Sequence, residues 1–167
     1  MSEWRWVEIY TTFLKITGEL EGPADRRLTD LVAGPGPVLD LRAAAVEAAT
    51  DHQHRLGGDG QRLTVVKAAI SLVCPHDQVG EAARDREGPG EKRRVAVQLS
   101  AQAFSMRGEV HLEPGVSLHD HLCGTGAGFV PVTGLSALWL AGAGEPRAVQ
   151  RGFALLNRAT LVSFAPV

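Results

Sequence analysis

The feature that most constrains this sequence is an internal repeat. When the chain of 167 residues is shifted against itself by 90 positions, residues of its first half fall on similar residues of its second half. One inserted residue after the Gly-rich turns then moves the offset to 91 and keeps the match to the end. The matched pairs include Val7 with Val97, Ile9 with Leu99, Gly18 with Gly108, Asp30 with Asp120, Lys67 with Arg158 and Pro75 with Pro166. We therefore predict two copies of one unit of about 70 residues.

Each structural element can be predicted twice, once from each copy. Residues 7–16 and 97–106 alternate apolar and polar side chains, which is the period of a β-strand. Gly18 and Gly108 then lie between two extended stretches, which predicts a bulge or a close backbone approach. Residues 28–32 and 118–122 place apolar residues three or four positions apart before a Gly-x-Gly stop, which predicts one helical turn.

The rest of each copy is predicted to be extended. Residues 38–46 are rich in alanine and could form a helix, but the second copy carries Pro131, Thr133 and Gly134 there, which suit two short strands with a bend. A polar turn precedes a closing strand at 63–74 and at 153–165. The predicted fold class is therefore mainly β, with two pseudo-symmetric small β-barrel or half-sandwich repeats, each with one short helical turn.

The predicted domain organisation is a first β repeat at residues 1–76, a charged flexible linker at 77–94 and a second β repeat at 95–167. The linker holds ten charged residues around a Gly-Pro-Gly sequence, a composition typical of a solvated segment. Its end, Lys92-Arg93-Arg94, could form a small basic contact, although the neighbouring Glu87 and Glu91 largely cancel that charge.

Three segments of the second copy together resemble a group of small uncharacterised bacterial β-barrel domains and, more distantly, the Sm-like and SH3-like barrels. They are Arg107-Gly108-Glu109-Val110, Leu118-His119-Asp120-His121-Leu122 and Phe129-Val130-Pro131-Val132. The resemblance covers nearly the whole of each copy, through apolar pattern and turn chemistry. It implies a fold and a tendency toward rings or β-augmented assemblies, and it implies no catalytic residues.

Composition narrows the function classes. With 44% apolar residues the chain can fill a core without disulfides or metals. The net charge of -2 and the pI near 6.3 argue against nucleic-acid binding, because phosphate contacts need an excess of Lys and Arg. The chain shows neither a signal peptide nor an apolar run long enough for a membrane helix, so we expect a cytoplasmic protein without membrane contact. Cys74 and Cys123 are expected to be small buried hydrophobes.

The densest polar cluster lies in the second copy and contains imidazole, carboxylate and thiol groups, all competent metal ligands. On a helical turn His119 and Cys123 share a face and His121 points away, whereas on a strand the three share one face. A site would also need His111 or Glu113 from the preceding hairpin. A zinc site on His111, His119, His121 and Cys123 is one hypothesis, and a surface turn rich in histidine is the other.

Asp30 and Asp120 are the one acidic position held in both copies. A pair of carboxylates could take part in acid-base chemistry. The simpler interpretation is a structural cap, in which each Asp accepts hydrogen bonds from backbone N–H groups at the start of the helical turn.

The two copies differ in charge, because residues 7–76 contain sixteen charged residues and residues 95–167 contain eight. In the second copy, Leu138, Trp139 and Leu140 make one strand apolar on both faces, so the first copy, another subunit or a different protein must cover its second face. We expect an interface here, anchored by Trp139. The alternative is that the two leucines meet the first copy inside one core. Trp4 and Trp6 form a second candidate patch.

Three functional hypotheses follow. The first is a non-catalytic assembly, adaptor or accessory subunit that contacts a protein partner, or other copies of itself, through the second repeat. The second is an Sm-like nucleic-acid-binding protein, which needs a basic stripe. The third is a metal-binding site or enzyme on the histidine and cysteine cluster. Catalysis is disfavoured, because no Ser-His-Asp or Cys-His set can be assembled from the spacing.

Overall fold

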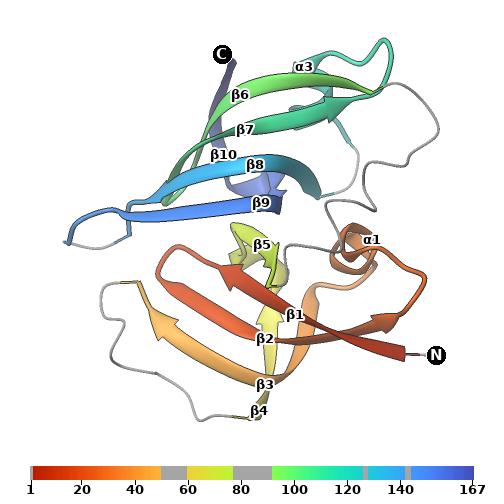
Figure 1. Cartoon of the computed structure of the whole chain (residues 1–167), viewed down its shortest axis with the longest axis vertical. Helices are drawn as coiled ribbons and strands as arrows, with labels where there is room; N and C mark the ends of the chain where they lie inside the picture. The colour runs from red at the N-terminus through yellow and green to blue at the C-terminus, as the bar shows by residue number, and fades with distance from the viewer. Residues whose placement is uncertain (1, 50–59, 77–91, 126–127, 142–143) are drawn as a thin grey trace.

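The computed structural model describes residues 2–49, 60–76, 92–125, 128–141 and 144–167. The described residues form one open antiparallel sheet of ten strands in the order β10-β6-β7-β8-β9-β5-β1-β2-β3-β4 (Figure 1). The strands of the first half are β1 (Ser2–Tyr10), β2 (Leu14–Pro23), β3 (Val38–Ala48), β4 (Gln61–Val66) and β5 (Leu72–Pro75). Those of the second half are β6 (Arg93–Ala101), β7 (Phe104–Leu112), β8 (Phe129–Trp139), β9 (Arg147–Asn157) and β10 (Leu161–Pro166).

The prediction of a mainly β fold with two short helical turns is confirmed. The helices are α1 (Leu28–Ala33) and α3 (Leu118–Cys123), at the two predicted places. The predicted barrels are not confirmed, because the sheet does not close. The closing strand of each half was also predicted as one element, and it is two strands joined by a single 3-10 turn, η1 (Lys67–Ala69) or η2 (Arg158–Thr160).

The two halves share one strand order and one set of pairings. The first half is ordered β5-β1-β2-β3-β4 and the second β10-β6-β7-β8-β9. Val7 pairs with Pro75 as Val97 pairs with Pro166, and the pairing of Val38 with Val66 corresponds to that of Phe129 with Asn157. Each of these correspondences falls at the offset of 90 or 91 found in the sequence.

Both halves bend at the predicted glycines. The pairing shifts between Thr17 and Glu19 in β2 and between Arg107 and Glu109 in β7, so Gly18 and Gly108 each lie in a bulge. A Cβ atom on Gly108 would lie 2.5 Å from Cγ1 of Val132, which explains why glycine is needed there.

The alanine-rich stretch is a strand, as its second copy indicated. Instead of two short strands it is one kinked strand, β3, with its counterpart β8. The kinks lie at Ala43, with φ of 49°, and at Gly134, with φ of 59°. These are equivalent positions, and the left-handed backbone is unfavourable for the alanine.

The helices are capped differently from the prediction. Ser117 is the N-cap of α3, and its Oγ accepts a hydrogen bond from the Asp120 N–H (3.0 Å) and donates one to Asp120 Oδ2 (2.6 Å). No side chain caps α1, which begins after Arg27. Asp120 therefore supports the cap without providing it, and Asp30 does not cap its helix.

The halves are joined by pairing between β5 and β9, where Leu72 lies opposite Leu156 and Val73 opposite Leu155. Side chains alternate along these strands between two cores. Leu72 and Leu156 belong to the core of the second half, whereas Val73 and Leu155 belong to the core of the first. Each core is therefore completed by strands of the other half.

The predicted linker ends before residue 94, because Arg93 and Arg94 already belong to β6. Residues 77–91 lie outside the described residues. Among the helices that the structure describes, none is long and apolar enough to cross a membrane.

Candidate functional site

Trp139 lies inside the molecule and is not exposed to a partner. Its side chain is 2% exposed, its ring stacks on Phe104 at 5.8 Å between centroids, and it meets the edge of Tyr10 at 5.5 Å. Its Nε1 donates a hydrogen bond to the backbone oxygen of Thr12, 3.1 Å away. Within the described residues Trp139 therefore joins the second half to the first, which is one of the three ways in which its strand was expected to be covered.

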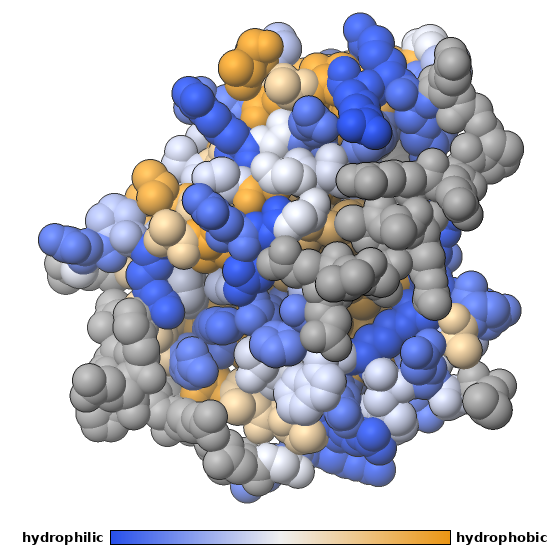
Figure 2. Space-filling view, viewed as in Figure 1, coloured by the Kyte–Doolittle hydropathy of each residue, from blue (hydrophilic) through white to orange (hydrophobic). Residues whose placement is uncertain are grey.

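The other predicted interface residues lie nearer the surface. Leu138 and Leu140 are 47% and 50% exposed, so they do not meet the first half in a common core. Trp6 is exposed beside His76, and Trp4 lies under the guanidinium of Arg42, 3.5 Å from its centroid. Figure 2 shows apolar side chains on one face of the molecule as separate patches among polar ones.

A buried charged network lies where the two halves meet. Glu8 of β1 is 4% exposed, and its Oε2 accepts hydrogen bonds from Arg151 Nε of β9 (3.0 Å) and from the Tyr10 hydroxyl (2.9 Å). Arg151 Nη2 also contacts this oxygen. Lys15 Nζ and His76 Nδ1 lie 3.3 and 3.4 Å from Oε1. Both carboxylate oxygens of Glu8 therefore have polar partners, and its contact with Arg151 links the two halves.

Burial by itself raises the pKa of Glu8, but the hydrogen bond from Arg151 and the charges of Lys15 and Arg151 outweigh it and lower that pKa to about 2. The same environment raises the pKa values of two neighbouring groups. Burial and the charge of Glu8 raise the pKa of Tyr10, and burial raises the pKa of the Cys74 thiol to about 12. Glu8 is thus held ionised, and Cys74 is held as an unreactive thiol.

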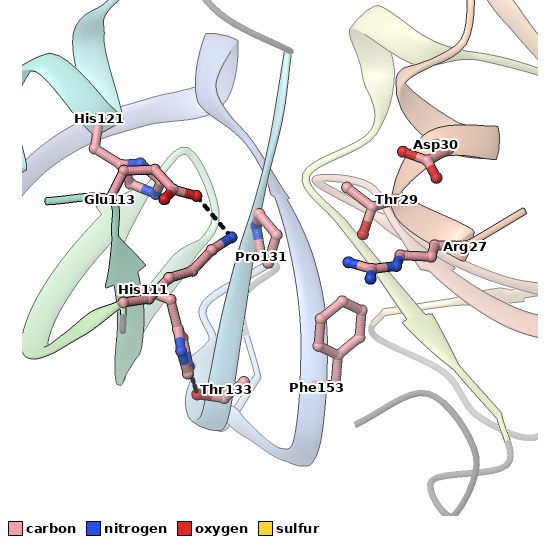
Figure 3. Close-up of a pocket in the computed structure, with 10 residues that line it drawn as sticks. Arg27, Thr29, Asp30, His111, Glu113, His121, Pro131, Thr133 and Phe153 are labelled. Atoms are coloured by element: carbon pink, nitrogen blue, oxygen red, sulfur yellow. Dashed lines mark hydrogen bonds and ion pairs between the residues drawn. The ribbon is translucent and has the colours of Figure 1, made fainter. Parts of the chain in front are cut away.

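A cavity of about 200 Å³ lies between the halves (Figure 3). Thr29 and Asp30 of α1 line one side, and His111, Glu113 and His121 of the second half line the other. Glu113 is paired with Lys92 at 2.9 Å, and His111 Nε2 is 2.8 Å from the Thr133 hydroxyl. Burial and the charges of Arg158 and Lys92 lower the pKa of His121, so this imidazole is neutral at pH 7. The cavity can hydrogen-bond a small polar molecule.

The predicted metal ligands come together only in part. His111 and His121 line the cavity, whereas His119 faces Phe164 with ring centroids 6.2 Å apart. Cys123 is exposed, contrary to its expected burial, while Cys74 is buried as expected; both are free thiols. No group of three or more His, Cys, Asp or Glu side chains able to hold a metal occurs among the described residues. The cavity therefore brings together only His111 and His121 of the four predicted zinc ligands.

The edges of the sheet are the remaining candidate surface. β4 pairs with β3 alone and β10 with β6 alone among the described strands, so each leaves one backbone edge open. Val66 of β4 and Val162 of β10 are 52% and 71% exposed. Unpaired edges that carry apolar side chains are sites for strand pairing.

No family model, no curated protein and no solved structure matches this chain. The site must therefore be interpreted from its own geometry.

Neither the charged network nor the open sheet edges had been predicted from the sequence. Glu8 interrupts a run of apolar residues at the end of β1, where residues 7–10 are buried on both faces, and this interruption was the available signal. The signal for the β4 edge was the apolar residue Val66 just before η1, at the position where the second half has the polar Asn157.

Proposed function

We propose that this protein is a non-catalytic assembly or adaptor subunit that acts through protein–protein contacts made by its sheet edges. The open outer edges of β4 and β10, with Val66 and Val162 exposed on them, carry this proposal. An extended edge offers backbone donors and acceptors to another strand, and pairing would also bury the valines.

The proposal includes a tandem duplication as the origin of the two halves. The equal strand orders, the matched pairings and the matched bulges support it. Sequence matches at a single offset with one inserted residue support it independently. Duplication also accounts for the two ends of the sheet. The outer strands β4 and β10 correspond to β9 and β5, which pair with each other inside the chain.

Leu138 and Leu140 are a second surface of the proposed subunit. Leu138 lies near the end of β8 and Leu140 directly follows that strand, and both are exposed whereas Trp139 between them is buried. A partner that contacts the flat of the sheet would use them, whereas a partner that contacts its edge would not. The two modes are separable by substitution.

The test is a gentle pull-down of the tagged chain from its native host, with mass spectrometry, together with light scattering of the purified protein. The proposal predicts a particle heavier than one chain, or another protein bound in a fixed ratio. A chain that stays monomeric at every concentration and retains no stoichiometric partner would falsify it.

A further inference from the structure

The pairing of β5 with β9 inside the chain serves as a template for contacts between chains. The two strands run antiparallel, with Leu72 opposite Leu156, and the Asn157 N–H donates to the backbone oxygen of Ser71 at 3.0 Å. This joint makes a continuous sheet from two five-stranded halves. It shows how the last strand of one half fits the fourth strand of the other.

The outer edges carry the counterparts of these two strands. β4 holds the place in the first half that β9 holds in the second, because Val66 pairs with Val38 as Asn157 pairs with Phe129. Likewise, β10 corresponds to β5. The two outer strands of the sheet, β4 and β10, are therefore unpaired counterparts of the two strands that form the internal joint.

Exposed apolar side chains mark the same positions. Ser71 and Asn157, which meet inside the joint, are 0% and 4% exposed. Their counterparts at an offset of 91, Val162 and Val66, are 71% and 52% exposed. The two valines are thus exposed at positions whose counterparts in the internal joint are buried. Pairing of the two edges would bury both valines.

Within the stretch that would pair, residues 64–66 and 162–164, neither edge has the usual protection against pairing. Lysine or an inward-pointing charge on an edge strand commonly prevents association. β4 has the sequence QRLTVV, with one arginine at its far end from Val66, and β10 has LVSFAP, without a charge. Pro166 lies at the last position of β10, outside the stretch that the template uses.

We propose that copies of this chain join head to tail, with β10 of one copy antiparallel to β4 of the next. In the register of the internal joint, Val162 lies opposite Val66, Ser163 opposite Val65 and Phe164 opposite Thr64. Each contact leaves one free β4 and one free β10 at the ends of the assembly, so further copies add in the same way. This inference rests on the proposed assembly function and names its partner as a second copy.

The outer joint differs from the inner one in charge. Glu8 and Arg151, which are paired across the inner joint, correspond to Gln98 and Gly60 at the outer one. The outer joint therefore lacks the counterpart of the buried ion pair. Because of this difference we expect the inner joint to be the stronger of the two, so that whole chains can leave and rejoin the assembly at the outer joint.

The test uses two chains with one exposed cysteine each, Val66→Cys and Val162→Cys, both with Cys123→Ser; the buried Cys74 is kept. Opposed residues of an antiparallel pair lie within about 5.5 Å between Cα atoms, a distance that a disulfide spans. Under oxidation by copper phenanthroline, we expect a disulfide-linked dimer when the two chains are mixed and none when either is oxidised alone.

The matched control mixes Val66→Cys with Ala165→Cys, three positions away along β10. At about 3.4 Å per residue this separation is roughly 10 Å, beyond disulfide reach. Thermal unfolding of each chain checks that all are folded. Equal cross-linking by both mixtures, or dimers of Val66→Cys alone, would overturn the proposed register.

The test separates this inference from the proposed function. A stable complex with another protein and no mixed dimer leaves the assembly function standing and overturns the head-to-tail pairing. A monomer with neither partner nor cross-link removes both.

Discussion

At the scale of single residues, Glu8 holds the two halves together. Its buried carboxylate accepts a hydrogen bond from Tyr10 and forms ion pairs with Arg151 and Lys15. Removal of one partner from such a network leaves a buried charge uncompensated, which typically costs several kcal/mol.

We expect Glu8→Gln to lower the free energy of unfolding by about 3 kcal/mol, because Arg151 then remains charged and partly buried. Urea unfolding of the full chain measures this change. The matched control is Glu19→Gln, which breaks the more exposed pair with Arg42 and should cost less than about 1 kcal/mol. Equal losses in the two variants would contradict the special role of Glu8.

The same residue predicts a pH dependence. The pKa of Glu8 is lowered from 4.5 to about 2 in the folded chain, so its contribution is present above pH 4.5 and is lost as the pH falls toward 2. The difference in unfolding free energy between the native chain and Glu8→Gln should therefore shrink over this range. A difference that stays constant from pH 5 to pH 2 would exclude this linkage.

Trp139 gives a prediction that separates core from surface. Trp139→Ala removes a buried indole and should cost about 3 to 5 kcal/mol. Leu138→Ser, at the next position on the exposed face, should change stability by about 0.5 kcal/mol or less. Thermal unfolding of the two variants decides, and a larger loss for Leu138→Ser would contradict the burial described above.

At the scale of elements, the kinks of β3 and β8 form a matched pair. Ala43 has a positive φ where the second half has Gly134. Ala43→Gly should raise the stability by about 1 kcal/mol, because glycine adopts this backbone without strain. Gly134→Ala should lower it by a similar amount. Calorimetry that shows the same sign for both changes would rule out backbone strain as the cause.

Elements with a signal in both copies could be predicted from the sequence. The bulges at Gly18 and Gly108, the helices α1 and α3 and the strand at residues 38–46 follow from local chemistry that appears twice. The joint could not be predicted, because which strand pairs with β5 depends on contacts distant in sequence. For the same reason the alternation of residues 7–16 did not reveal that Glu8 is buried, and the sequence left open what covers Trp139.

At the scale of the whole molecule, the described residues form one continuous sheet whose two ends match its own middle. Thr12 and Gln102, which are equivalent at the offset of 90, contact each other at 3.3 Å through their side chains. The tips of two equivalent hairpins, one from each half, are therefore in contact.

Head-to-tail addition of copies that keeps these tips together predicts a closed ring, with residues 11–13 and 101–103 near its centre. Negative-stain electron microscopy of the purified full chain checks this geometry. Discrete rings of uniform diameter are expected. Fibres of variable length would show instead that the repeated operation does not close.

The most direct test of the account is the mass of the particle in solution. By light scattering, the native chain and Leu138→Lys should both give a discrete multiple of 17.8 kDa, and Val162→Lys should give 17.8 kDa, since a charge on β10 prevents edge pairing. A native chain of 17.8 kDa, or a particle that Leu138→Lys dissociates and Val162→Lys leaves intact, would contradict head-to-tail assembly through the sheet edges.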